Sequence, residues 1–339
     1  MFPPHGKPIA GKEEDESMMG ILTRAREKYG PYIRWKRDLI DELTTGSLLV
    51  ATERGPIEYT IRGEDGPYVA VIHGGPGGYD QTSALFSELF GKGFRILSWS
   101  RPGYIRTPLN VGRAFEEQAE ALTSLLNALG IDRTAVLGYS AGGPPAVYFA
   151  AHNPDRIWAM ILECAVSHKY EINNSNIGEH IFFKHLMFND PSLWLADIIA
   201  HHAPMIVGWA TIEMESFLDE DEVRKLMGGI MHDEHRVNVL MNLMKSMSPV
   251  ELRKEGLKND MDQLSKIDSL PFKQIEIPTL IIHGADDFDV PLEHAQKAAE
   301  SIPNAELSII EGGFHILALS NAADEVNKKR IMFLKTHSP

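Results

Sequence analysis

The sequence has very little cysteine, since Cys164 is the one cysteine among 339 residues. An intramolecular disulfide is therefore excluded, which fits a reducing compartment. Long apolar runs are also lacking, because no stretch approaches the ~18 consecutive apolar residues that predict a membrane-spanning helix. Residues 1–19 carry the acidic run 13–16 instead of the basic-then-apolar order of a secretory signal. We therefore expect a flexible tail there and a cytoplasmic protein.

Basic residues are scarce relative to acidic ones: 33 Lys and Arg stand against 47 Asp and Glu, a formal net charge of -14. Nucleic acids and anionic membranes require a basic face, so we expect neither as a partner. The sequence also lacks a phosphate-binding G-x-x-x-x-G-K-[ST] motif, an H-E-x-x-H motif and clustered cysteines, so it predicts no metal or cofactor. The pairs His201-His202 and His232/His235 are interpreted as solvated helix faces. The oligomeric state stays open.

Apolar runs of strand length alternate with amphipathic helical segments from Tyr68 onward. Strands are predicted at 68–72, 94–99, 134–137, 157–162, 277–282 and 306–310, and helices at 83–90, 115–129, 141–152, 292–301 and from about 316. Runs this apolar leave no wet face, which predicts a mostly parallel sheet with helices on both sides. Before this region, 21–45 has helical spacing interrupted at Gly30-Pro31, and 48–61 is typical of a hairpin.

The alternation of strands and helices stops near Val166 and resumes near Ile277. Between these points the sequence contains many helix-like segments and no convincing strand. We therefore expect three parts: a tail and helical extension over 1–45, an α/β core of 46–166 and 271–339, and a helical cap inserted at 167–270.

The strongest local signal is the pentapeptide 138–142, Gly-Tyr-Ser-Ala-Gly, a match to G-x-S-x-G between an apolar strand and a helix. A serine on so sharp a turn projects its hydroxyl freely, and side chains at Gly138 and Gly142 would collide with neighbouring backbone. The start of the helix behind it favours developing negative charge. Ser140 is the predicted nucleophile.

A second motif, His73-Gly74-Gly75-Pro76-Gly77-Gly78, directly follows a predicted strand. Acyl transfer creates an oxyanion, which preorganised backbone N–H groups stabilise best. A loop rich in glycine lets the backbone approach the reacting carbonyl closely. We predict that the Gly75 and Ala141 N–H groups form this oxyanion hole, with His73 and Gly74 supporting the loop.

The general base and the acid that orients it are expected in loops after the last two strands. His315 lies just past the strand that ends at Ile310, and its pKa near neutrality suits a general base. Asp287 follows the strand that ends at Ile282 and is the preferred acid, but Asp286 and Asp289 remain alternatives. The order Ser140, Asp287, His315 is the one expected when a serine nucleophile, an acid and a histidine follow separate strands of this kind of sheet.

These motifs resemble those of the α/β-hydrolase superfamily, over about Leu48 to Leu334. The 73–78 loop is similar to the form in proline-iminopeptidase-like members, which implies an esterase-like or peptidase-like serine hydrolase with a cap after the sixth core strand. Many relatives carry an Asp after the fourth strand, whereas this chain reads Ser98-Trp99-Ser100-Arg101. That departure weakens the carry-over from the peptidases. Serine at position 140 argues against the Asp-dependent epoxide hydrolases and haloalkane dehalogenases.

The favoured activity is hydrolysis of an ester or related acyl bond of a small, apolar substrate. Nine of the fourteen methionines fall within 167–270, and they could line an adaptable pocket or simply fill the helix core. The alternatives are an aminopeptidase, a C–C bond or lactone hydrolase, and a non-catalytic binding protein. The same segment contains the aromatic residues Trp194, Trp209, Phe182, Phe183, Phe188 and Phe217. An aminopeptidase needs carboxylates that hold the substrate amino terminus, and the candidates are Glu213, Glu215, Asp219, Glu220, Asp221 and Glu222.

Overall fold

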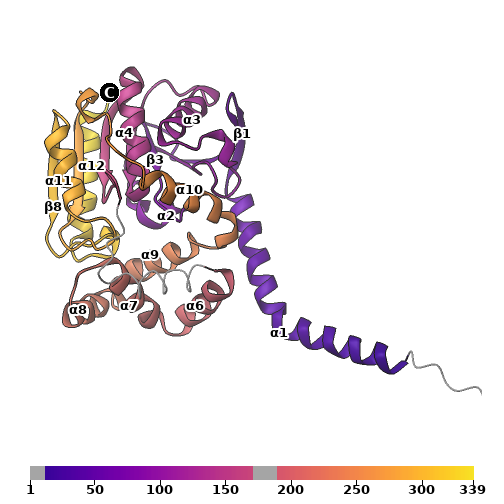
Figure 1. Ribbon diagram of the computed structural model, residues 1–339. Coiled ribbons are helices and arrows are strands. Elements are labelled where there is room, and N and C mark those ends of the chain that lie inside the picture. Colours follow the sequence, from indigo (N-terminus) through magenta and orange to yellow (C-terminus); the bar gives the residue numbers. More distant parts are fainter. Residues whose placement is uncertain (1–11, 171–188) are drawn as a thin grey trace, which may run out of the picture.

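An eight-stranded sheet forms the centre of the molecule, which is a computed structural model that describes residues 12–170 and 189–339 (Figure 1). The strand order is β1-β2-β4-β3-β5-β6-β7-β8. The strands are β1 (Leu48–Thr52), β2 (Gly55–Arg62), β3 (Tyr68–Ile72), β4 (Arg95–Trp99), β5 (Thr134–Tyr139), β6 (Ile157–Glu163), β7 (Thr279–Gly284) and β8 (Ala305–Ile310). The β1–β2 hairpin and the β2–β4 pair are antiparallel, and every later pairing is parallel.

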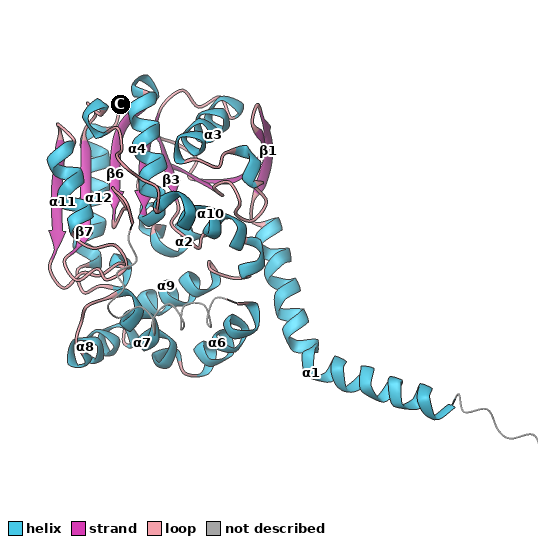
Figure 2. Ribbon diagram, in the orientation of Figure 1, coloured by secondary structure: helices cyan, strands magenta, loops and turns pink. Residues whose placement is uncertain are grey.

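Helices cover both faces of the sheet, as the apolar strands predicted (Figure 2). Alternate residues of β3 show why: Ala70 and Ile72 pack in a core cluster with α3 (Phe115–Ala128), α4 (Gly143–His152) and α11 (Glu293–Ser301). Val69 and Val71 belong to a second cluster with α2 (Gln81–Leu85) and α12 (Ala323–His337). Successive side chains of a strand point to opposite faces, so burial of all four requires a layer on each side.

The described residues between β6 and β7 form five α-helices: α6 (Asp190–His202), α7 (Pro204–Glu215), α8 (Glu220–Met231), α9 (Glu234–Lys245) and α10 (Lys254–Leu264). Apart from one bridge between Ser216 and Asp287, no strand pairing was found for the described part of this insertion. Leu226, Met227 and Leu240 join the core cluster that includes α12, so α8 and α9 rest on the core. Residues 171–188, including Phe182, Phe183 and Phe188, lie outside the described residues.

The N-terminal expectation was wrong in two respects. Residues 12–19, predicted as part of a flexible tail, are helical, and the predicted interruption at Gly30-Pro31 is absent because α1 (Lys12–Thr45) runs through Pro31. A proline inside a helix removes one hydrogen bond and bends the axis, and Figure 1 shows α1 changing direction along its length. Packing keeps the helix together after this point: the Tyr32 ring lies 5.8 Å from that of Trp194 on α6.

Two further elements differ from the predicted spans. The helix expected at 83–90 is divided into α2 and a 3-10 turn, η1 (Ser87–Leu89), because Phe86 leaves helical geometry at φ -130°. The last helix begins at Ala323 rather than near Ile316, since 317–319 is a separate 3-10 turn. No described helix is both long and apolar enough to cross a membrane.

Candidate active site

The turn after β5 holds Ser140 in a strained conformation. Ser140 has a φ of +52°, in the left-handed region that a residue with a Cβ rarely adopts, and its side chain is buried. A Cβ on Gly142 would lie 2.2 Å from the carbonyl oxygen of Ile72. A Cβ on Gly138 would lie 2.7 Å from the Ala146 Cβ. Both positions therefore require glycine, for the steric reason that the sequence suggested.

The glycine-rich loop after β3 lies against this turn. A Cβ on Gly74 would come within 2.9 Å of the Ser140 Cβ, so only glycine allows the loop to approach so closely. Ala141 is the middle residue of the 3-10 turn Ser140–Gly142 that leads into α4. The two predicted oxyanion donors, Gly75 and Ala141, are thus each one residue from this contact.

The loops after β7 and β8 bring the predicted acid and base together. The His315 Nδ1 lies 2.9 Å and 3.1 Å from the two carboxylate oxygens of Asp287. The Val290 N–H donates to Asp287 Oδ1 at 2.8 Å, which holds the carboxylate in place. Asp286 uses its backbone in the same loop, where its N–H donates to the Gly313 carbonyl. Of the three candidate acids, Asp287 is the one at Nδ1.

Tyr139, next to the serine, connects the β5 turn to the histidine loop. Its hydroxyl donates to the His315 carbonyl oxygen at 3.3 Å, and the two rings lie 5.2 Å apart. The His315 N–H donates to the Glu215 carbonyl at the end of α7, so the insertion also positions this loop. Ser140, His315 and the end of α7 therefore meet at one place in the molecule.

Two further carboxylates lie near the His315 ring. Asp289 Oδ2 is 3.6 Å from His315 Nε2, and one oxygen each of Asp289 and Glu215 lies within 4.8 Å of the other and of the imidazole. The Tyr170 hydroxyl donates to Asp289 Oδ1 at 3.3 Å. The sequence indicated Asp289 only as a candidate acid and Glu215 only as one of six carboxylates. No signal in the sequence predicted that both would lie beside the His315 ring.

The other five of those carboxylates have a different setting. Asp219 and Glu222 form a capping box at the start of α8, where each side chain accepts from the other's backbone N–H. Glu220 pairs with Arg224 one turn later. Glu213 and Asp221 are exposed. Most of this acidic run therefore serves helix α8 or faces solvent.

The neighbouring carboxylates determine the direction in which the pKa of the buried His315 imidazole is shifted. Burial alone would lower the pKa of His315, but Asp287, followed by Asp289 and Glu215, outweighs it and raises the pKa to about 9. Cys164 also lies beside the acid: it has φ +43°, is fully buried, and is hydrogen-bonded to Asp287. Burial raises the pKa of its thiol well above the usual value, which favours the protonated, weakly nucleophilic form.

Two sets of described side chains are close enough to share a metal ion, and both contain His315: one with Cys164 and Asp287, one with Glu215 and Asp289. The histidine pairs of the insertion belong to neither. The His201 and His232 rings each contact a carbonyl one turn earlier on their own helix, and both are exposed. This is the solvated arrangement that the sequence indicated.

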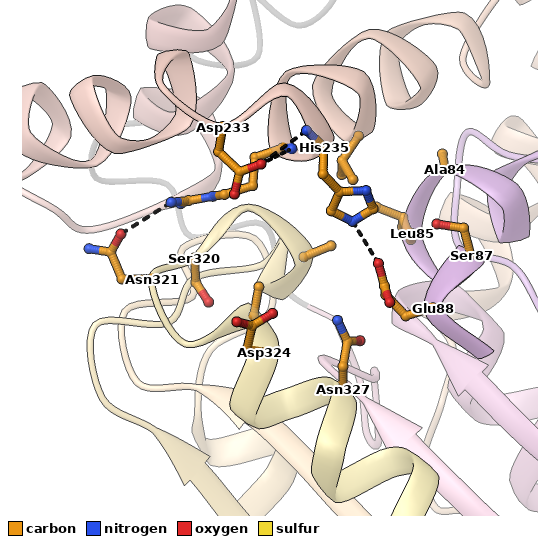
Figure 3. A pocket seen from close by; sticks show the side chains of 14 residues that line it. Ala84, Leu85, Ser87, Glu88, Asp233, His235, Ser320, Asn321, Asp324 and Asn327 are labelled. Carbon is orange, nitrogen blue, oxygen red and sulfur yellow. Dashed lines mark hydrogen bonds and ion pairs between the residues drawn. The ribbon is translucent and has the colours of Figure 1, made fainter. Parts of the chain in front are cut away.

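A cavity of about 130 Å³ lies where α9 meets the core (Figure 3). His235 of α9 pairs there with Glu88 of η1 at 2.8 Å, and Arg236 reaches Asn321 before α12. The cavity lining comes from 84–88, 233–239 and 318–327, and it contains none of the predicted site residues. The cavity is therefore separate from Ser140, and it marks a polar contact between insertion and core.

Comparison with known proteins identifies the class to which this fold and site belong. Residues 67–322 match the α/β-hydrolase fold family, so the chain belongs to that family. A solved α/β-hydrolase fold protein from Nakamurella multipartita is 34% identical, with a TM-score of 0.78, over 85% of this chain and 99% of that one.

Two curated relatives give the family a more particular setting. An uncharacterized hydrolase, YcgS, of Bacillus subtilis is 26% identical over 85% of this chain and 98% of its own. A 2-hydroxy-6-oxo-6-phenylhexa-2,4-dienoate hydrolase of Comamonas testosteroni is 26% identical over 82% of this chain and 91% of its own. The chain is accordingly an α/β hydrolase, and one of these relatives has a substrate in its name.

Proposed function

We propose that this α/β hydrolase is a serine hydrolase that cleaves an ester or related acyl bond of a small substrate through an acyl-enzyme. The observation that carries the proposal is the Asp287–His315 pair, held against the strained turn that presents Ser140. A nucleophile, a base and a group that orients the base are the parts that acyl transfer requires. No cofactor is needed, since water completes the cycle.

In the proposed reaction, His315 Nε2 takes the proton of Ser140 as the serine oxygen attacks the substrate carbonyl. Asp287 stabilises the resulting imidazolium through Nδ1. The Gly75 and Ala141 N–H groups hold the oxyanion, and the leaving group departs with the proton from His315. Water then attacks the acyl-enzyme in the same way, which restores the serine.

A second candidate, C–C bond hydrolysis, is favoured by the Comamonas testosteroni relative. The compound in that relative's name carries a ketone and no ester, so its hydrolysis must break a carbon–carbon bond. The same serine, histidine and oxyanion donors can act at a ketone. An apolar substrate fits either reaction, although Met227 and Met244 of the insertion are buried in core clusters rather than free to line a pocket.

A fluorophosphonate probe tests the proposed nucleophile directly. We expect wild-type protein to gain the mass of one phosphonyl group, because an activated serine displaces the fluoride, and Ser140→Ala to gain none. Intact-mass spectrometry is the measurement, with Ser100→Ala as a control that removes another buried serine. An unmodified wild type, or a Ser140→Ala protein that still reacts, would instead support a binding protein or another nucleophile. Ester, ketone and lactone panels then distinguish the bond cleaved.

The pH dependence tests the role of His315. The base must be neutral, and its pKa is raised to about 9, so kcat/KM for an uncharged substrate should increase with pH until about pH 9. Asp289→Asn removes a negative charge 3.6 Å from Nε2, so the rise of kcat/KM with pH should end about one pH unit lower in this variant. Asp262→Asn, on the exposed face of α10, is the control. An unchanged pH dependence in Asp289→Asn would contradict this account of the imidazole.

A further inference from the structure

His73 is hydrogen-bonded to the peptide that carries one predicted oxyanion donor. The ring is buried, and its Nε2 accepts the Arg101 backbone N–H at 2.9 Å, which places the ring proton on Nδ1. The Nδ1–H then donates to the Gly74 carbonyl oxygen at 2.6 Å. Burial and the nearby Arg101 charge hold the pKa of His73 well below its usual value, so the ring stays neutral with this single proton.

Peptide planarity transmits this hydrogen bond to Gly75. The Gly74 carbonyl and the Gly75 N–H belong to one rigid trans peptide, so they point in opposite directions. Fixing the carbonyl against the His73 ring therefore fixes the direction of the N–H. A loop with this much glycine would otherwise leave that peptide free to rotate.

Arg101 is itself held by a carboxylate from the insertion. Its Nε donates to the His73 carbonyl oxygen at 2.9 Å, and its two terminal nitrogens donate to the two oxygens of Asp260 at 2.8 Å and 2.5 Å. Both side chains are fully buried. A buried two-point ion pair of this kind is strong and directional, and removing one partner leaves an uncompensated charge.

Tyr104 completes the arrangement. Its hydroxyl donates to Asp260 Oδ2 at 2.6 Å, and its ring stands edge-on to His73 at 4.7 Å. A Cβ on Gly75 would lie 3.0 Å from the Tyr104 hydroxyl oxygen and 3.3 Å from Asp260 Oδ2. The Asp260 carboxylate of α10 therefore lies close beside Gly75, and it also holds the Arg101 side chain.

We propose that Asp260 of α10, through Arg101 and His73, is a positioning residue that aims the Gly75 N–H at the oxyanion. The inference rests on the proposed serine-hydrolase function. It gives α10, the last helix of the insertion, a role in transition-state stabilisation. It also explains how the loop 98–107, which departs from the pattern of many relatives, acts here: Arg101 takes its carboxylate from α10.

Asp260→Asn tests this proposal against a matched ion pair. Asp80 pairs at 2.8 Å with Arg253, a fully buried arginine of the insertion, and Arg253 donates to the Gly77 carbonyl, so this pair holds the same loop at a different peptide. We expect Asp260→Asn to lower kcat about 30-fold with KM changed less than threefold, because losing one oxyanion donor outright costs about 100- to 1,000-fold. Asp80→Asn should lower the melting temperature without this loss of kcat.

Binding of a trifluoromethyl ketone provides a readout that a purely structural role would not move. The Ser140 oxygen adds to this ketone to give a hemiketal whose oxyanion lies at Gly75, and the serine proton goes to His315. The inhibition constant should therefore increase by the same factor by which kcat falls in Asp260→Asn, and by less in Tyr104→Phe. If Asp260→Asn does not fold, Tyr104→Phe serves in its place, with an expected loss of kcat of about threefold. Equal kcat and equal ketone binding in Asp260→Asn and Asp80→Asn would overturn the proposal. A wild type that the fluorophosphonate does not label would overturn the proposed function itself.

Discussion

Replacing His315 with glutamine is expected to lower kcat about 10⁶-fold, because triad members act as a unit and loss of the base removes nearly all of the activation of the serine. Glutamine is similar in size but cannot accept the serine proton at neutral pH. The measurement is steady-state turnover of the best ester from the panel, with active protein quantified by its folded fraction. The rate of fluorophosphonate labelling should fall in parallel, since it depends on the same activation.

His152→Gln is the matched control for this prediction. His152 is partly exposed at the end of α4 and contacts Glu116 rather than the site, so its loss should leave kcat within about twofold. A His315→Gln protein that kept a tenth of the wild-type kcat would show that another group is the base. His283 would then be the next residue to test, because its Nε2 lies 3.4 Å from Asp287 Oδ2.

The parts of the site that were predicted from the sequence depend on short-range geometry. A strand, a G-x-S-x-G turn and a helix impose steric conditions that act within five residues. In the folded chain these conditions appear as the lack of space for a Cβ at Gly138 and Gly142. The strand pattern likewise predicted a sheet covered on both faces, since burial of every side chain of a strand allows no other arrangement. Local rules of this kind can be applied to a single sequence.

The helical extension shows where a local rule fails. Pro31 costs a helix about 3 kcal/mol in isolation, which is why the sequence predicts a break. Contacts distant in sequence offset that cost: the Trp35 indole donates to Asp197 at 3.1 Å, and Lys36 pairs with Asp190. Propensity is a weak guide when a segment packs on another element.

The positions of Asp260 and Glu215 around the site could not be predicted from the sequence for the same reason. Asp260 is 159 residues from Arg101, and only the packing of α10, at the end of the insertion, brings the two side chains together. Glu215 likewise reaches His315 because α7 ends beside the β8 loop. A spacing that depends on the packing of a whole insertion leaves no periodic trace in the sequence, whereas Asp287 and Asp289 were identifiable because they follow a strand directly.

Asp287→Asn should lower kcat about 10⁴-fold, the effect expected when a triad histidine keeps its place but loses the group that holds its tautomer. The asparagine oxygen can still accept the Val290 N–H, so the loop should stay folded while the imidazolium loses its charged partner at Nδ1. The matched controls are Asp286→Asn, expected within about twofold of wild type, and Asp289→Asn, expected to shift the pH dependence without a comparable loss at its plateau. Turnover measured across pH for all three separates these roles. The opposite result would be a 10⁴-fold loss of kcat in Asp289→Asn and only a shifted pH dependence of turnover in Asp287→Asn. It would exchange the roles assigned to the two carboxylates, and the nitrogen that acts as the base would then be Nδ1 instead of Nε2.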